Sequence, residues 1–225
     1  MDSLNYCADI VMCKIKRTFT YNSTPMLTLS ILYPKVALCY CPYAQDSINY
    51  QIQAQVFNFL HYVSSDLYQQ AVATYKESQE NKFPFRLYEA VLQYEITYNQ
   101  DCHLSLYRDQ YTFTGGAHGG TIRASNTWNL LGGCSVPLSC FFTDDPDNRA
   151  LLMEYITEQA NEKNAQNSGI YFEEFPTLMK EYFDEEHYYL TCSGFAIYYQ
   201  QYEIAPYSTG IVVFTIPYTD SSCCT

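Results

Sequence analysis

A glycine-rich segment at residues 115–120 surrounds a single histidine and is the part of the sequence best suited to chemistry. Histidine titrates near neutral pH, so His118 has the properties of a general base, and glycines let another group approach the backbone closely. A phosphate site would need a nearby lysine and a helix beginning directly after the loop. Residues 121–127 instead have strand composition and contain no lysine, which argues against nucleotide binding. Two interpretations of His118 stay open: a functional base, or a histidine hydrogen-bonded within a tight loop.

A second unusual segment, residues 201–210, places two tyrosines, a glutamate, a proline and a glycine between two strand-like runs. We expect this turn to lie close to the loop at 115–120. The alternative is a rigid β-turn whose tyrosine hydroxyls bond nearby backbone. The candidate ligand-binding residues are Gly115, Gly116, His118, Gly119, Glu203 and Tyr207.

Motifs for catalysis or metal binding are absent from the sequence. It has no GxSxG nucleophile elbow, no HExxH pair and no CxxC pair among its ten cysteines. His187 follows two glutamates in an acidic run, and we expect its side chain to be solvated. We therefore predict no catalytic residue, no metal and no cofactor, and the sequence favours a protein that is not an enzyme.

Composition limits the classes of partner. The chain has 225 residues, 17% of them aromatic, which excludes a disordered protein. The net charge of −12 would repel a phosphate backbone, so nucleic acid is not an expected partner, whereas a basic protein would be attracted. No stretch is long and apolar enough to span a membrane, and no secretory signal is recognisable. The sequence as given therefore predicts a cytoplasmic protein.

Two periodicities predict the fold class. Apolar residues recur every three or four positions over 48–71, which is typical of an amphipathic helix capped by Asp46 or Ser47. Residues 88–99 alternate as in a half-buried antiparallel strand. We predict an α+β fold in which one long and one or two shorter helices pack on an antiparallel sheet. The predicted organisation is a single compact domain over 8–219, made of halves at about 8–114 and 115–219, with a tail at 220–225.

Five segments together resemble a known bacterial family over about residues 10–218. They are TGGAHG at 114–119, WNL at 128–130, PLSCFF at 137–142, YEIAPYSTG at 202–210 and IPY at 216–218. In order and spacing they are similar to extracytoplasmic α+β domains that include the lysozyme-binding sensing domain of the sigma-V anti-sigma factor. A related module precedes the catalytic domain of a peptidoglycan deacetylase. The resemblance implies a location outside the cytoplasm and a ligand such as lysozyme or a peptidoglycan fragment.

Three functional hypotheses remain from the sequence. The first is a non-catalytic binding domain for a basic protein such as lysozyme, or for cell-wall fragments. The second is a hydrolase or transferase acting on carbohydrate or peptide, which requires a pocket with convergent titratable groups. The third is a cytoplasmic structural or oligomer-forming protein. The anti-sigma factor's sigma-binding and transmembrane segments have no counterpart in this sequence, so inhibition of a sigma factor is not expected.

Overall fold

The computed structural model describes residues 6–142 and 147–218, and the chain divides into two compact units. Unit 2 consists of residues 9–94 and 108–122, and unit 1 of residues 1–8, 95–107 and 123–225. The predicted division into halves at residue 114 stays a prediction.

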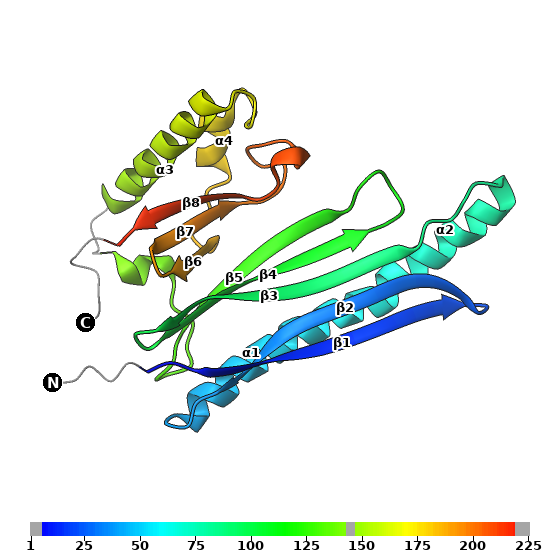
Figure 1. Ribbon diagram of the computed structural model, residues 1–225, viewed down its shortest axis with the longest axis horizontal. Coiled ribbons are helices and arrows are strands. Elements are labelled where there is room, and N and C mark those ends of the chain that lie inside the picture. Colours follow the sequence, from blue (N-terminus) through cyan, green and yellow to red (C-terminus); the bar gives the residue numbers. More distant parts are fainter. Residues whose placement is uncertain (1–5, 143–146, 219–225) are drawn as a thin grey trace. The chain divides into compact units, whose positions relative to one another are not determined.

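Within the described residues the strands form two sheets (Figure 1). The first has the spatial order β1 (Asp9–Tyr21), β2 (Thr24–Ala37), β3 (Tyr88–Gln100), β4 (His103–Phe113) and β5 (Gly120–Asn129). The second has the order β6 (Tyr188–Thr191), β7 (Gly194–Tyr199) and β8 (Val212–Pro217). The helical elements are α1 (Pro42–Tyr62), the π-helical turn η1 (Val63–Leu67), α2 (Tyr68–Asn81), the 3₁₀ turn η2 (Leu138–Phe141), α3 (Asp147–Gln166), α4 (Phe175–Glu181) and the 3₁₀ turn η3 (Tyr207–Thr209).

The α+β class predicted from the sequence is confirmed, with two sheets that are mostly antiparallel. The exception is the pair β2–β3, which is parallel from Leu27 opposite Tyr88 to Leu32 opposite Gln93. Parallel neighbours need a long crossover connection, and here the connection is the long helical segment of unit 2. Strands β1 and β2 form a hairpin whose turn uses positive φ angles at Asn22 and Ser23.

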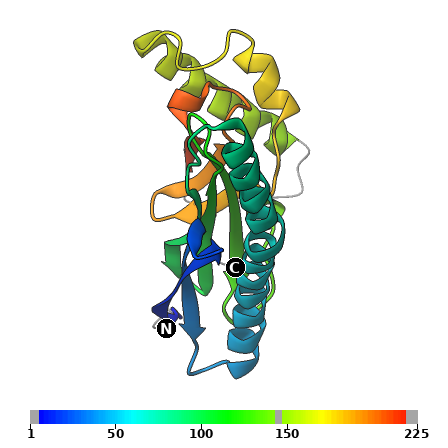
Figure 2. The same cartoon turned by 90° about the vertical axis from the view of Figure 1, so that its right-hand side faces the viewer.

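The long helix of unit 2 is formed by α1, η1 and α2 and runs along the strands of that unit (Figure 2). Its predicted apolar stripe is confirmed: residues at spacings of three and four are buried, namely Ile48, Ile52, Val56, Phe59 and Val63. The helix begins at Pro42 rather than after Asp46, because proline is tolerated in the first turn, where its missing N–H costs nothing. It ends at Lys82, whose φ of 58° is left-handed.

Two side chains near the start of α1 fix this helix to the end of β2. Asn49 accepts a hydrogen bond from the Val36 N–H at 2.9 Å and donates one to the Val36 carbonyl at 2.7 Å. Gln45 accepts from the Leu38 N–H at 3.0 Å. These bonds satisfy backbone groups at the end of β2, which fixes the position of α1 along the strands.

Unit 1 has an aromatic core between β6–β8 and the helices α3 and α4. All six residues of β7 are buried, as expected for a central strand covered on both faces. Tyr199 donates a hydrogen bond from its hydroxyl to the Met179 carbonyl at 2.9 Å, which fixes α4 against β7. Among the described residues no helix is long and apolar enough to cross a membrane.

Candidate functional site

An open pocket of about 470 Å³ on unit 1 contains one of the candidate residues, Glu203. It lies where α4 ends, along the segment that leads to β6, and at the turn after β7. Four carboxylates line it, beside one arginine, one histidine and two aromatic rings: Glu181, Asp184, Glu185, Glu203, Arg149, His187, Tyr182 and Phe183.

The acidic segment before β6 is folded into a tight turn by Asp184. Its carboxylate accepts the Glu186 N–H at 2.9 Å, and its carbonyl accepts the His187 N–H at 3.0 Å. The second carboxylate oxygen lies 3.8 Å from Nε2 of His187. The turn therefore places a carboxylate beside the imidazole ring inside the pocket.

His187 is held by its ring rather than surrounded by water, so the expectation of a solvated side chain is wrong. Its side chain is only 21% exposed and stacks on Tyr198 with ring centroids 4.8 Å apart. The buried Nδ1 has no hydrogen-bond partner among the described residues. Nε2 lies 3.5 Å from the amide nitrogen of Gln200, at the limit of a hydrogen bond. Cross-strand stacking of this kind depends on pairing between β6 and β7, which the acidic run alone does not reveal.

Glu203 is positioned by a strained turn that follows β7. Tyr202 has a φ of 69°, which is rare for a tyrosine. Oε2 of Glu203 accepts the Gln200 N–H at 2.6 Å, and the Gln200 side chain bonds the Arg123 backbone at both its oxygen and its nitrogen. Gln200 thus links the Glu203 carboxylate to Arg123, where the part of β5 that belongs to unit 1 begins.

Partial burial raises the pKa of the Glu203 carboxyl above its ordinary value. The hydrogen bond from Gln200 and the nearby His187 lower that pKa, and the charge of Asp184 raises it. The ionised Glu203 in turn helps raise the pKa of the buried Tyr199 hydroxyl, although burial is the main cause there. A cation placed beside Glu203 would stabilise its charged form.

The outer side of the pocket carries exposed charge. Arg149 lies 3.8 Å from the Glu185 carboxylate and stacks on Phe183, with the guanidinium carbon 5.2 Å from the ring centroid. Both partners of the ion pair are more than half exposed, so the pair contributes little to stability.

The other candidate residues are distributed between the two units. Tyr207, in η3, contacts the Tyr202 ring at 5.9 Å between centroids, close in sequence to Glu203. The loop with Gly115, Gly116, His118 and Gly119 belongs to unit 2. The expected proximity of this loop to the turn at 202–210, and a ligand-binding role for either, stay predictions.

The glycines of the loop have clear structural reasons. Gly115 has a φ of +84°, and the Gly116 carbonyl accepts a hydrogen bond from the Arg86 side chain at 2.9 Å. A Cβ on Gly119 would lie 2.4 Å from the Tyr111 ring and 2.5 Å from the Thr112 carbonyl oxygen. His118 is exposed, with Nδ1 3.3 Å from the Gly119 carbonyl. These contacts agree with the interpretation of a histidine within a tight loop.

Charge is distributed very unevenly between the units. By sequence, unit 1 has seventeen Asp and Glu against four Lys and Arg, whereas unit 2 has seven against eight. The acidic character of the protein therefore belongs to unit 1, the unit that carries the pocket. Among the described residues no group of three His, Cys, Asp or Glu is arranged to hold a metal ion.

Two family models match the chain, and together they confirm the resemblance seen in the sequence. Residues 20–121 match the model described as Deacetylase PdaC, and residues 140–219 match the model described as a protein of unknown function, DUF3298. The chain thus combines a PdaC-like segment with a DUF3298-like segment in an α+β fold. A comparison with curated proteins gave no match.

Solved structures of two DUF3298 proteins have the same fold. One, from Bacteroides fragilis, is 20% identical, with a TM-score of 0.67 over 94% of this chain and 90% of the other. The second, from Pseudomonas aeruginosa, is 16% identical, with a TM-score of 0.58 over 93% of this chain and 89% of the other. At this level of identity the likeness establishes the fold and does not extend to ligands.

Proposed function

We propose that unit 1 binds a basic protein of the lysozyme type and that the acidic pocket around Glu203 receives a lysine or arginine side chain of that partner. The observation that carries the proposal is the concentration of four carboxylates in one open pocket of a unit whose sequence charge is strongly negative. The negative electrostatic potential of unit 1 increases the rate of encounter with a cationic protein.

The geometry of Glu203 supports a cationic group as the ligand. Burial makes its charged form costly in the unbound protein, and an entering ammonium or guanidinium group would stabilise that form. The pocket's aromatic side chains, Tyr182 and Phe183, offer ring faces that attract cations, as the contact of Arg149 with Phe183 illustrates. The resemblance seen in the sequence adds lysozyme as the partner to test first.

The experiment is a calorimetric titration of the full chain with a hen-egg-type lysozyme at low salt and at about 150 mM salt, where exposed charge attraction is largely screened. Cytochrome c, a second small basic protein, is titrated in parallel. The proposal expects saturable binding of lysozyme that survives the higher salt, and weaker, salt-labile binding of cytochrome c. If the two proteins bind with equal affinity and equal salt dependence, the binding is non-specific charge attraction and the proposal is contradicted.

Matched charge variants locate the interface. Glu181→Gln with Glu185→Gln removes two exposed carboxylates from the pocket, and Glu154→Gln with Glu158→Gln removes two exposed carboxylates from α3. Both pairs change the net charge equally. We expect the pocket pair to weaken binding about fivefold or more and the α3 pair to have a smaller effect. Equal effects of the two pairs would show that the pocket has no special role.

A further inference from the structure

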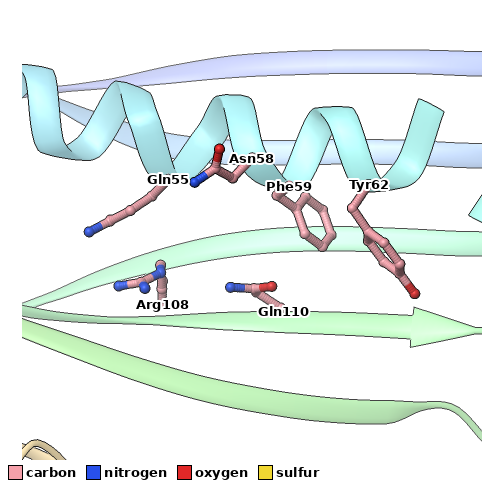
Figure 3. A pocket seen from close by; sticks show the side chains of 6 residues that line it. All are labelled: Gln55, Asn58, Phe59, Tyr62, Arg108 and Gln110. Carbon is pink, nitrogen blue, oxygen red and sulfur yellow. The ribbon is translucent and has the colours of Figure 1, made fainter. Parts of the chain in front are cut away.

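A second pocket, of about 230 Å³, lies within unit 2 between α1 and β4 (Figure 3). Its lining is polar and aromatic but contains no carboxylate: Gln55, Asn58, Phe59, Tyr62, Arg108 and Gln110. In Figure 3 the side chains of Gln55, Phe59 and Tyr62 project from α1 toward β4. The pocket differs from the acidic one in charge, in residue type and in the unit that forms it.

Helix periodicity explains why polar groups gather here. Gln55, Asn58 and Tyr62 follow one another at spacings of three and four, so they share a stripe along α1. This stripe lies beside the buried apolar one that contains Val56 and Phe59. The helix therefore presents amides and a phenol next to its core-facing side.

The sheet side of the pocket is formed by alternate residues of β4. Arg108 and Gln110 are two positions apart and project from the same face of the strand. Earlier in β4, Leu104 and Leu106 are fully buried, so this face changes from apolar to polar along the strand. Arg108 is the one side chain with a formal charge in the lining.

The pocket wall is ordered by a buried hydroxyl. Tyr94 is 1% exposed, and its hydroxyl donates a hydrogen bond to Oε1 of Gln55 at 2.9 Å. That bond fixes the orientation of the Gln55 amide group. Burial raises the pKa of Tyr94, and the positive charge of Arg108 lowers it, so the guanidinium acts on the same buried region.

From these features we infer that the pocket binds a hexuronic acid, a single sugar ring that bears a carboxylate. A guanidinium matches a carboxylate with two parallel hydrogen bonds, and three amide side chains each offer a donor and an acceptor to ring hydroxyls. The aromatic rings of Phe59 and Tyr62 present negative faces suited to the C–H side of a sugar.

The pocket's size and charge select against other ligand classes. The volume is below the usual range for drug-sized ligands, which restricts the occupant to about one ring. A polyphosphate is disfavoured because the lining offers it one cation, Arg108, and no glycine-rich loop at the beginning of a helix. An apolar ligand would cover these amides and the guanidinium without offering them a hydrogen bond, which is costly. The inference is independent of the proposed role of unit 1, because no residue is common to the two pockets.

The test titrates the ¹⁵N-labelled 225-residue chain with D-glucuronate and D-galacturonate and follows the side-chain amide signals by NMR. D-glucose, which lacks the carboxylate, and acetate, which lacks the ring, are the comparison ligands. Arg108→Gln removes the charge from the pocket. Arg17→Gln makes the same change at an exposed position of β1 outside the pocket and is the matched control. Asn58→Ala alters an exposed lining residue without disturbing the core.

At least one uronate should bind saturably, and glucose and acetate should each bind about tenfold more weakly or less. Arg108→Gln should weaken uronate binding about tenfold and Asn58→Ala about fivefold, while Arg17→Gln leaves it unchanged. If Arg108→Gln does not fold, Asn58→Ala decides the role of the pocket. Three outcomes overturn the inference: neither uronate saturates by about 10 mM, acetate binds as well as the uronates, or the pocket variants that fold bind as the wild type does.

Discussion

The contacts around Gly119 predict that this residue tolerates no side chain, while its neighbour Gly120 does. A Cβ on Gly119 would lie 2.4 Å from the Tyr111 ring and 2.5 Å from the Thr112 carbonyl oxygen, far inside ordinary contact distance. The ring can rotate, but the carbonyl belongs to the backbone of β4, so the strand or the loop must move. At Gly120 a Cβ would meet no atom within 4 Å.

Overpacking of this kind costs about 1–3 kcal/mol, so we expect Gly119→Ala to lower the free energy of unfolding by about 2 kcal/mol. With a urea dependence of about 2 kcal/mol per molar, the unfolding midpoint falls by about 1 M. Gly120→Ala should leave the midpoint unchanged or raise it slightly, because alanine restricts the unfolded chain.

Urea denaturation followed by circular dichroism measures both midpoints under the same conditions. The two variants change adjacent residues, the last of the loop and the first of β5, by the same methyl group, so composition and location are matched. Equal midpoints for the two variants would refute the steric argument. A stable Gly119→Ala protein would also remove the structural explanation of Gly119 and strengthen a ligand-binding one.

Two further predictions concern buried polar groups. Glu203→Gln should stabilise the protein more at pH 7 than near pH 4. The folded state raises the pKa of the Glu203 carboxyl, so folding disfavours the ionised form that is present at the higher pH. Thermal melts of both proteins across this pH range measure the difference in stability, and a difference that does not change with pH would contradict the prediction. Tyr94→Phe should lower the free energy of unfolding by about 1 kcal/mol by removing the hydrogen bond to Gln55. Tyr50→Phe, at a position of α1 that is 75% exposed, should change it by less than about 0.5 kcal/mol. Equal urea midpoints for the two tyrosine variants would count against the second prediction.

Local periodicity was sufficient to predict the position of two elements, the long helix of unit 2 and strand β3. The alternation beginning at Tyr88 and the helical stripe beginning at Ile48 both follow from which side chains must be buried, and both are confirmed. The antiparallel pairing predicted for 88–99 is wrong on the side of β2, to which β3 is parallel. The helix starts at Pro42, earlier than the predicted cap at Asp46 or Ser47, because proline also suits a first helical turn.

Pairings between distant segments could not be predicted in the same way. Leu27 and Tyr88 pair in parallel although the whole long helix lies between them in the sequence. No local pattern distinguishes this pairing from an antiparallel one. The burial of His187 likewise depends on Tyr198, a residue of the next strand. The sequence identified Glu203 as a candidate, but the pocket around it is assembled from α4, the acidic turn and Gln200, which only the folded chain brings together.

The interleaved composition of the two units has a consequence for how the protein is made and cut. When residue 122 has been synthesised, every residue of unit 2 is present, whereas unit 1 still lacks everything from residue 123 onward. Unit 2 can therefore fold first during translation while residues 95–107 await their partners. For the same reason, a single cleavage after residue 122 leaves every residue of unit 2 on one fragment but separates residues 1–8 and 95–107 from the rest of unit 1.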